Sequence, residues 1–166
     1  MILSFSTQLN GKPTYFVERI WASFPNEDPF NIDLFYLEAK KTGKYTFEDQ
    51  VDRHPKIHSI REDKNNRWKV GMMIDFFINN RTKNVFCFAP RIQVLSTQRV
   101  FMTYLPHLGN GFEMSIDGTY CCDSTIHKLA LNDGFDSVQD FQNYFISQMK
   151  DGEFSGKIIH WTDFKY

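Results

Sequence analysis

The chain opens with apolar residues at helical spacing and changes to strand patterns in its middle. Pro13 is placed to open a first helical turn, and Phe16, Ile20 and Trp21 follow at positions that share one helix face. A second and weaker helical pattern begins at Phe30. We therefore expect a helix soon after residue 13 and a marginal one after residue 30.

From Val70 onward, apolar residues alternate as they do in a half-buried strand. Met72, Ile74 and Phe76 lie on one face of the first run, and two more runs rich in β-branched and aromatic residues cover 85–88 and 92–102. Asp117-Gly118 lies between the runs 113–116 and 119–122, which predicts a hairpin with a two-residue turn. The middle of the chain is thus predicted to form antiparallel strands.

Helical spacing returns near the carboxyl end. Ser124 is placed to cap a short helix ending near Leu131, and Ser137 is placed to cap a second one. The second helix carries an apolar stripe formed by Val138, Phe141, Phe145 and Met149. A closing strand is expected at 157–161. This order of elements predicts an α+β fold, with an antiparallel barrel or curved sheet flanked by helices.

Length and composition indicate one domain with a full core. The chain has 166 residues, of which 42% are hydrophobic and 16% aromatic, and this excludes a disordered chain. Charge is unevenly distributed: residues 1–55 carry a net charge of −2, residues 56–112 carry +6 and residues 113–166 carry −5. A basic middle suits an anionic ligand such as a nucleotide or a nucleic acid backbone, unless the acidic flanks fold over it.

Cysteine usage and hydropathy bear on the compartment. Cys87, Cys121 and Cys122 form neither a disulfide framework nor a zinc-ligand set. The start lacks signal-peptide features, and no apolar run reaches the roughly 20 residues that a membrane helix needs. His54 and His58 are spaced as helical metal ligands, but Pro55 argues against a shared helix. We expect a cytoplasmic protein with reduced thiols, no membrane association, no metal and no cofactor.

The segment 56–69 holds the candidate binding residues. Lys56, Ser59 and Arg61 place an ammonium, a hydroxyl and a guanidinium within six residues, and a bulge near Lys56 would bring all three to one rim. Arg67 and Trp68 precede another lysine, which suits stacking on a base while holding a phosphate. The alternative is structural: a solvated Lys56, Ser59 bonded to backbone, Arg61 paired with a neighbouring carboxylate and Trp68 in the core.

The Lys56-x-x-Ser59-x-Arg61 motif resembles that of the ASCH domains, which belong to the PUA-like superfamily. The resemblance includes the helix-forming segment 15–21 and Asp133-Gly134 ahead of the last helix, and it covers residues 1–24 and 54–166. Residues 25–53 would then be an insertion in a single domain. The resemblance implies a small PUA-like barrel with a pocket at its mouth for a base or modified nucleoside. Some ASCH members are similar to amidohydrolases acting on N4-acetylcytidine.

These observations give three functional hypotheses. The first is binding of an RNA base, modified nucleoside or nucleotide by Lys56, Ser59, Arg61, Arg67 and Trp68. The second, implied by the resemblance, is an amidohydrolase for an N4-acylated cytidine-type nucleoside with Lys56, Ser59 and Asp133 as catalytic residues. In it serine replaces the family's threonine and aspartate its glutamate. The third is a protein-interaction domain whose partner binds residues 25–53.

One geometric expectation follows from the charge distribution. The helix after Ser137 should cover an open end of the sheet and bring its acidic approach, Asp133 and Asp136, toward the basic motif. Asp133 is therefore expected within about 16 Å of Lys56, which is two Debye lengths at physiological salt.

Overall fold

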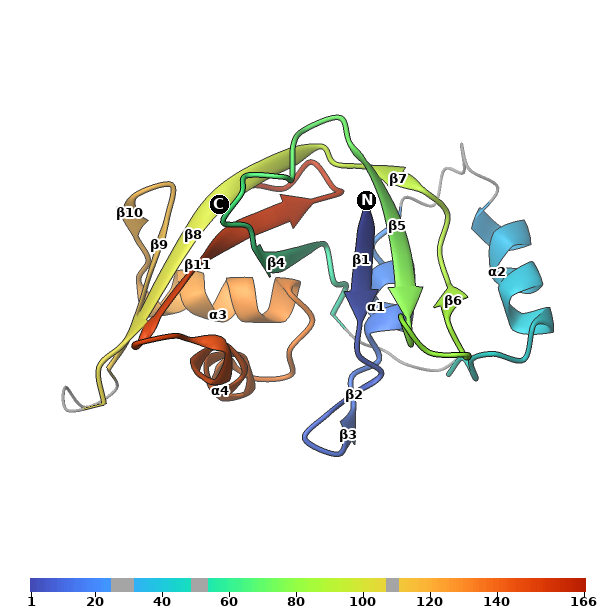
Figure 1. Ribbon diagram of the computed structural model, residues 1–166, viewed down its shortest axis with the longest axis horizontal. Coiled ribbons are helices and arrows are strands. Elements are labelled where there is room, and N and C mark those ends of the chain that lie inside the picture. Colours follow the sequence, from blue (N-terminus) through green and yellow to red (C-terminus); the bar gives the residue numbers. More distant parts are fainter. Residues whose placement is uncertain (25–31, 49–53, 107–110) are drawn as a thin grey trace.

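The computed structural model describes residues 1–24, 32–48, 54–106 and 111–166, and it shows an α+β fold. Its large sheet is antiparallel, with the strand order β10-β9-β8-β11-β4. The strands are β4 (His58–Glu62), β8 (Ser96–Tyr104), β9 (Phe112–Ile116), β10 (Thr119–Tyr120) and β11 (Glu153–His160). Figure 1 shows α3 (Asp123–Asn132) and α4 (Val138–Gln148) lying together beneath this sheet.

A small sheet forms the other half of the molecule. It contains β1 (Ile2–Phe5), β5 (Met73–Ile78), β6 (Phe86–Cys87) and β7 (Ile92–Gln93). The short hairpin β2 (Gln8–Leu9) and β3 (Lys12–Pro13) follows β1, and α1 (Phe16–Trp21) follows the hairpin. The helix α2 (Ile32–Lys41) lies at the end of the molecule opposite to β10 (Figure 1).

Several local predictions are confirmed. The hairpin turn consists of Asp117 and Gly118, both with positive φ, as the two-residue turn requires. Ser137 caps α4, because its side chain accepts a hydrogen bond from the Asp140 backbone N–H. Phe141 and Phe145 are buried under the large sheet, whereas Val138 is only half-buried.

The predicted barrel is not present among the described strands, which form separate sheets instead. The run 92–102 is split because the chain passes from one sheet to the other inside it: the Val94 N–H bonds to Met72 O and the Leu95 N–H bonds to His160 O. The small sheet also contains a parallel pair, β1 with β5, which the expected antiparallel arrangement lacks.

Two helix starts differ from the prediction. Pro13 lies in β3, and Thr14 closes that hairpin through its N–H to Thr7 O, so α1 begins only at Phe16. The helix α3 begins at Asp123 after Cys122, one residue before the predicted cap. In both cases a β-hairpin ends shortly before the helix, and the end of the hairpin determines where the helix begins.

The core consists of two clusters that share β11. The small-sheet cluster is built around Leu3, Ile74, Phe76, Phe88 and Trp161, and the large-sheet cluster around Ile60, Met102, Phe141, Phe145 and Ile158. Successive strand residues point to opposite faces. Ile158 therefore packs in the large-sheet cluster and Ile159 in the small-sheet cluster.

Candidate functional site

A cavity of about 340 Å³ lies where β1, β4 and α4 meet. Six of its fifteen lining residues are aromatic, and its polar groups come from β1, from β4 and the segment before it, from α4 and from the connection between α3 and α4. The lining residues are Ser4, Phe5, Ser6, Leu9, Phe16, Lys56, Ile60, Arg61, Glu62, Asp133, Phe135, Tyr144, Phe145, Gln148 and Phe154. The volume falls in the usual range for small-molecule sites.

Lys56 enters the cavity between two helices. Its backbone N–H bonds to Arg19 O at 2.9 Å, and the next N–H, of Ile57, bonds to Asn132 O at 2.9 Å. The Lys56 side chain is only 2% exposed, and its Nζ donates to Asp133 Oδ1 at 2.5 Å and to the Asp133 backbone oxygen. Nζ also lies 4.8 Å from the centre of the Phe16 ring.

Gly134 makes the close approach of Lys56 to Asp133 and to the Phe16 ring possible. Its φ is +85°, and a Cβ at this position would lie 3.1 Å from both Lys56 Cδ and the Phe16 ring. A larger residue would combine backbone strain with pressure on the lysine stem. The Asp133-Gly134 dipeptide thus supplies both the carboxylate and the space that Lys56 needs.

In the Lys56–Asp133 pair, burial and charge shift each pKa in opposite directions. Burial lowers the pKa of Lys56 to about 8, although the Asp133 carboxylate partly opposes the shift. Burial also raises the pKa of Asp133, but the Lys56 charge and the neighbouring His58 outweigh it, so the net pKa lies below the usual value. At neutral pH the cavity therefore holds an ion pair, and Lys56 gives up its proton in mildly alkaline solution.

A chain of polar side chains runs from Asp133 to the surface. His58 Nε2 lies 2.8 Å from Tyr166 Oη, which accepts a hydrogen bond from Asn132 Nδ2 at 2.8 Å. Asn132 Oδ1 lies 2.8 Å from Nε2 of the exposed His54. The donors and acceptors are mutually consistent if His54 Nε2 and Tyr166 Oη each donate, which makes His58 Nε2 an acceptor.

His58 therefore presents its Nδ1 to the carboxylate. This atom is 3.6 Å from Asp133 Oδ1, which is too long for a hydrogen bond, and it has no other partner in the described structure. Burial lowers the pKa of His58, so its ring is neutral at physiological pH. Asp133 consequently has two nitrogen neighbours: it bonds to the Lys56 ammonium and only approaches the neutral ring of His58.

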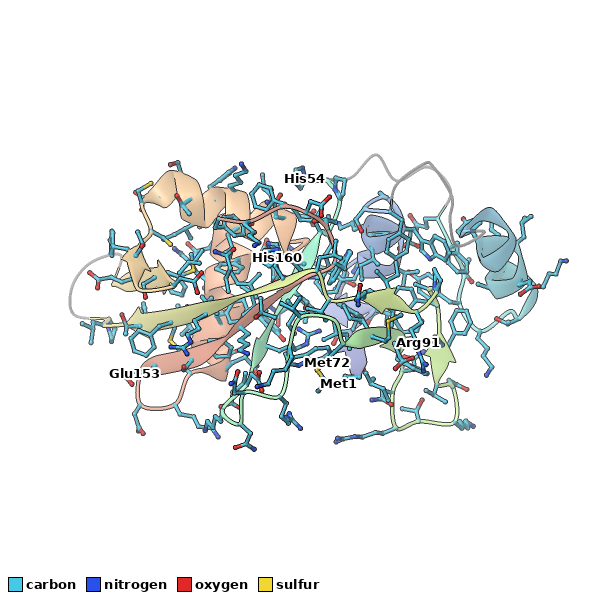
Figure 2. All side chains as sticks on the ribbon, turned by 90° about the horizontal axis from the view of Figure 1, so that it is seen from above. Met1, His54, Met72, Arg91, Glu153 and His160 are labelled. Atoms are coloured by element: carbon cyan, nitrogen blue, oxygen red, sulfur yellow. The ribbon has the colours of Figure 1, made fainter. Side chains whose placement is uncertain are left out.

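His160 lies beside this chain, near the middle of the molecule (Figure 2). Its ring centre is 5.3 Å from that of His58, and neither of its nitrogens has a partner among the described residues. Burial and the neighbouring His58 lower the pKa of His160 to about 3. This ring is uncharged under ordinary conditions.

The structure brings together some of the predicted site residues. The expected proximity of Asp133 and Lys56 is confirmed by their ion pair. Arg61 also lines the cavity, where its Nη1 donates to Ile60 O and its Nη2 donates to Ser4 O, both at 2.9 Å. Asp136 instead pairs with the buried Arg19 of α1.

The remaining predicted residues lie elsewhere. Ser59 is fully buried, does not line the cavity, and its hydroxyl has no partner among the described groups. Trp68 is 4% exposed within the small-sheet cluster, so the predicted stacking role is wrong: a buried ring has no face for a base. Arg67 is exposed on a loop, where its Nε lies 4.0 Å from Asp63 Oδ1.

Sequence reasoning missed Tyr166 and the aromatic walls. Tyr166 is 108 positions from His58, and nothing in the local pattern signals their contact. Phe135 and Tyr144 follow Asp133 closely and could have been found by asking which aromatic residues lie near the motif's carboxylate. Among the described residues no group of three or more His, Cys, Asp or Glu side chains is placed to hold a metal ion.

Comparison of the chain with protein-family models, with curated proteins and with solved structures found no match. Within the parts of the chain that the structure describes, none of the helices has the length and apolar character to span a bilayer. The two ends of the predicted insertion, 25–31 and 49–53, lie outside the described residues, so the interaction surface predicted for 25–53 stays a prediction.

Proposed function

We propose that the cavity binds a nucleobase as part of a nucleoside or nucleotide. The observation that carries this proposal is the combination of aromatic walls with one buried donor and one buried acceptor, Lys56 and Asp133. Aromatic side chains stack on any base. A fixed donor beside a fixed acceptor selects the base whose edge carries the matching acceptor and donor.

The polar pair favours a cytosine-type edge. Cytosine offers an amino group to an acceptor such as Asp133, and its neighbouring carbonyl and ring nitrogen accept from a donor such as Lys56. Uracil has a carbonyl in place of the amino group, and that oxygen would face the Asp133 carboxylate. At the rim, the Arg61 guanidinium is the cation available to a 5′-phosphate.

Calorimetric titration with cytidine, uridine, adenosine, guanosine and their 5′-monophosphates tests the proposal. Cytidine should bind more tightly than uridine, and cytidine monophosphate should lose part of its advantage over cytidine in Arg61→Gln. Tyr144→Ser removes a half-buried aromatic wall and should weaken binding about 5- to 150-fold, the range of one stacked base. Leu37→Ser on the distant α2 is the control. No binding of any nucleoside at millimolar concentration would overturn the proposal.

A second candidate, the amidohydrolase, is favoured by the mildly acidic Lys56 ammonium in the cavity. With Ser59 outside the cavity, the nucleophile would be water. Asp133 would take a water proton as the oxygen adds to the acyl carbon, and Lys56 would protonate the departing exocyclic amine as the C–N bond breaks. The products would be cytidine and acetate. Incubation with N4-acetylcytidine tests this: turnover should survive Ser59→Ala and disappear in Lys56→Met.

A further inference from the structure

The outer face of the large sheet carries a row of exposed aromatic and serine side chains. Strand β8 alternates between buried Val100 and Met102, which contact the α3–α4 layer, and exposed residues such as Phe101. Phe101 is 41% exposed, and its partners on the two neighbouring strands are both serines, Ser115 and Ser155. Small partners on both sides leave much of the Phe101 side chain open to solvent.

The same row contains a second aromatic residue. Tyr120 on β10 pairs with Ser115, so it shares the face of Phe101 one strand further on, and it is 66% exposed. Two strand spacings separate the backbones of the two aromatic residues by about 10 Å. Tyr120, Ser115, Phe101 and Ser155 together form the aromatic row.

Cations lie along one side of the aromatic row. Arg99 and Lys157 are cross-strand partners in the next row, and both line a hollow of about 450 Å³ that also includes Phe101 and Asn66. The Lys157 side chain is only 12% exposed, and its Nζ donates to Asn66 Oδ1 and to Trp68 O and lies 3.7 Å from Asp63 Oδ2, so Arg99 is the cation of this pair that faces solvent. Arg67 shares the Asp63 carboxylate, so one carboxylate serves two cations here.

Carboxylates flank the row on its other side. Thr103, the half-buried residue two positions after Phe101 on β8, is paired with Glu113 and Glu153, and Figure 2 shows Glu153 at the outer end of β11. One carboxylate lies on the Arg99 side instead: that of Asp117 accepts hydrogen bonds from the Arg99 backbone N–H at 2.8 Å and from the Gln98 side-chain amide at 3.1 Å. No side-chain hydrogen bond or ion pair of Arg99 is found among the described residues, and its guanidinium is exposed.

We infer that this face binds single-stranded nucleic acid, with two bases stacked on Phe101 and Tyr120 and a backbone phosphate held by the exposed Arg99. Aromatic side chains on an open sheet stack unpaired bases, and adjacent cations hold the phosphates. The glutamates repel phosphate and so keep the backbone on the cation side. A duplex does not fit, because its bases are already stacked and paired. The inference goes beyond the proposed function, because it uses none of the cavity residues.

Fluorescence anisotropy with labelled 12-nucleotide oligouridine and a 12-base-pair RNA duplex tests the inference. Phe101→Ser and Tyr120→Ser should each weaken binding of the single strand about 5- to 150-fold, whereas Phe101→Tyr should retain it. Arg99→Gln should reduce the slope of log affinity against log salt by about 0.7, as loss of one phosphate contact does for a single strand. The controls are Leu37→Ser for exposed apolar area and Lys83→Gln for exposed charge, and neither should alter binding.

Competition separates this surface from the cavity. Cytidine at a concentration that saturates the cavity should leave oligouridine bound. Displacement by cytidine would assign the binding to the cavity and overturn the inference. An equal affinity for duplex, or an unchanged affinity in both serine variants, would show electrostatic attraction alone and also overturn it. Failure of nucleosides to bind the cavity leaves this test unaffected.

Discussion

At the scale of single residues, the Lys56–Asp133 pair determines the chemistry of the cavity. Both side chains are almost fully buried, so each charge depends on the other for its solvation. Asp133→Asn should lower the free energy of unfolding by about 3–5 kcal/mol, because it leaves a buried ammonium without its carboxylate. Urea unfolding at pH 7 measures the loss.

The double variant Lys56→Met, Asp133→Asn provides the control for that prediction. With the charge removed as well, most of the lost free energy should return, and a double-mutant cycle should give a coupling well above 1 kcal/mol. If the losses of the two single variants simply add, the ion pair is not the reason for the destabilisation.

The two buried histidines predict a pH dependence of stability. Burial lowers the pKa of both rings, that of His160 to about 3, whereas the unfolded value lies near 6.5. Below pH 6.5 the unfolded chain therefore binds protons that the folded chain does not. The free energy of unfolding should fall as the pH is lowered, by about 1.4 kcal/mol per pH unit for each histidine that stays neutral.

His160→Leu isolates one of these contributions. Between pH 6.5 and about pH 3, the unfolding free energy of this variant should fall less steeply with decreasing pH than that of the wild type. The difference between the two slopes is the contribution of one histidine. Chemical unfolding at several pH values measures both slopes. Identical slopes would mean that His160 is protonated in the folded protein.

The residue scale also shows what the sequence could reveal about the site. Lys56 and Asp133 were found because a motif and a charge argument both pointed to them. Ser59 and Trp68 were misplaced because spacing does not tell which face of a strand or loop a side chain occupies. Tyr166 was missed because its partner is far away along the chain.

At the scale of elements, local signals were accurate where only neighbouring residues decide the outcome. The Asp117-Gly118 hairpin and the Ser137 cap are both short-range structures and both are present. The chain crossing at Val94 and the parallel β1–β5 pair depend on hydrogen bonds to distant strands, which periodicity does not encode.

The cap of α4 gives the prediction at this scale. Ser137→Ala removes the acceptor for the Asp140 N–H, which lies 3.0 Å from the serine oxygen, and should lower the free energy of unfolding by about 1 kcal/mol. Ser147→Ala is the matched control, because the Ser147 hydroxyl makes its hydrogen bonds within the same helix: it donates to Tyr144 O and accepts from Gln148 Nε2. Urea denaturation followed by circular dichroism compares the two. Equal effects would show that the cap contributes nothing specific.

At the scale of the whole molecule, the two core clusters share the strand β11, and they also meet where the rings of Phe16 and Phe135 lie 6.1 Å apart. Adjacent residues of β11, Ile158 and Ile159, belong to different clusters, and β11 also pairs with both β8 and β4. The buried Arg19 of α1 adds a further connection, since its Nη1 donates at 2.7 Å to the backbone oxygen of Gly134, which follows α3. Neither half can lose its packing without disturbing the strand that the other half uses.

This sharing predicts that the described halves unfold as one cooperative unit. All three tryptophans of the chain report on the small-sheet cluster, whereas Phe141 is fully buried in the large-sheet cluster. Phe141→Ala should lower the free energy of unfolding by about 3–5 kcal/mol through the cavity it leaves. Its tryptophan fluorescence transition should move to lower urea together with the circular dichroism transition.

Gln139→Ala, at an exposed position of the same helix, is the control and should shift both transitions by less than about 0.5 kcal/mol. The informative result is the relation between the two probes in Phe141→Ala. If fluorescence keeps the wild-type midpoint while circular dichroism splits into two steps, β11 does not couple the clusters. Coincident transitions would mean that a substitution beneath the large sheet weakens the small sheet equally, because Ile158 and Ile159 cannot be released separately.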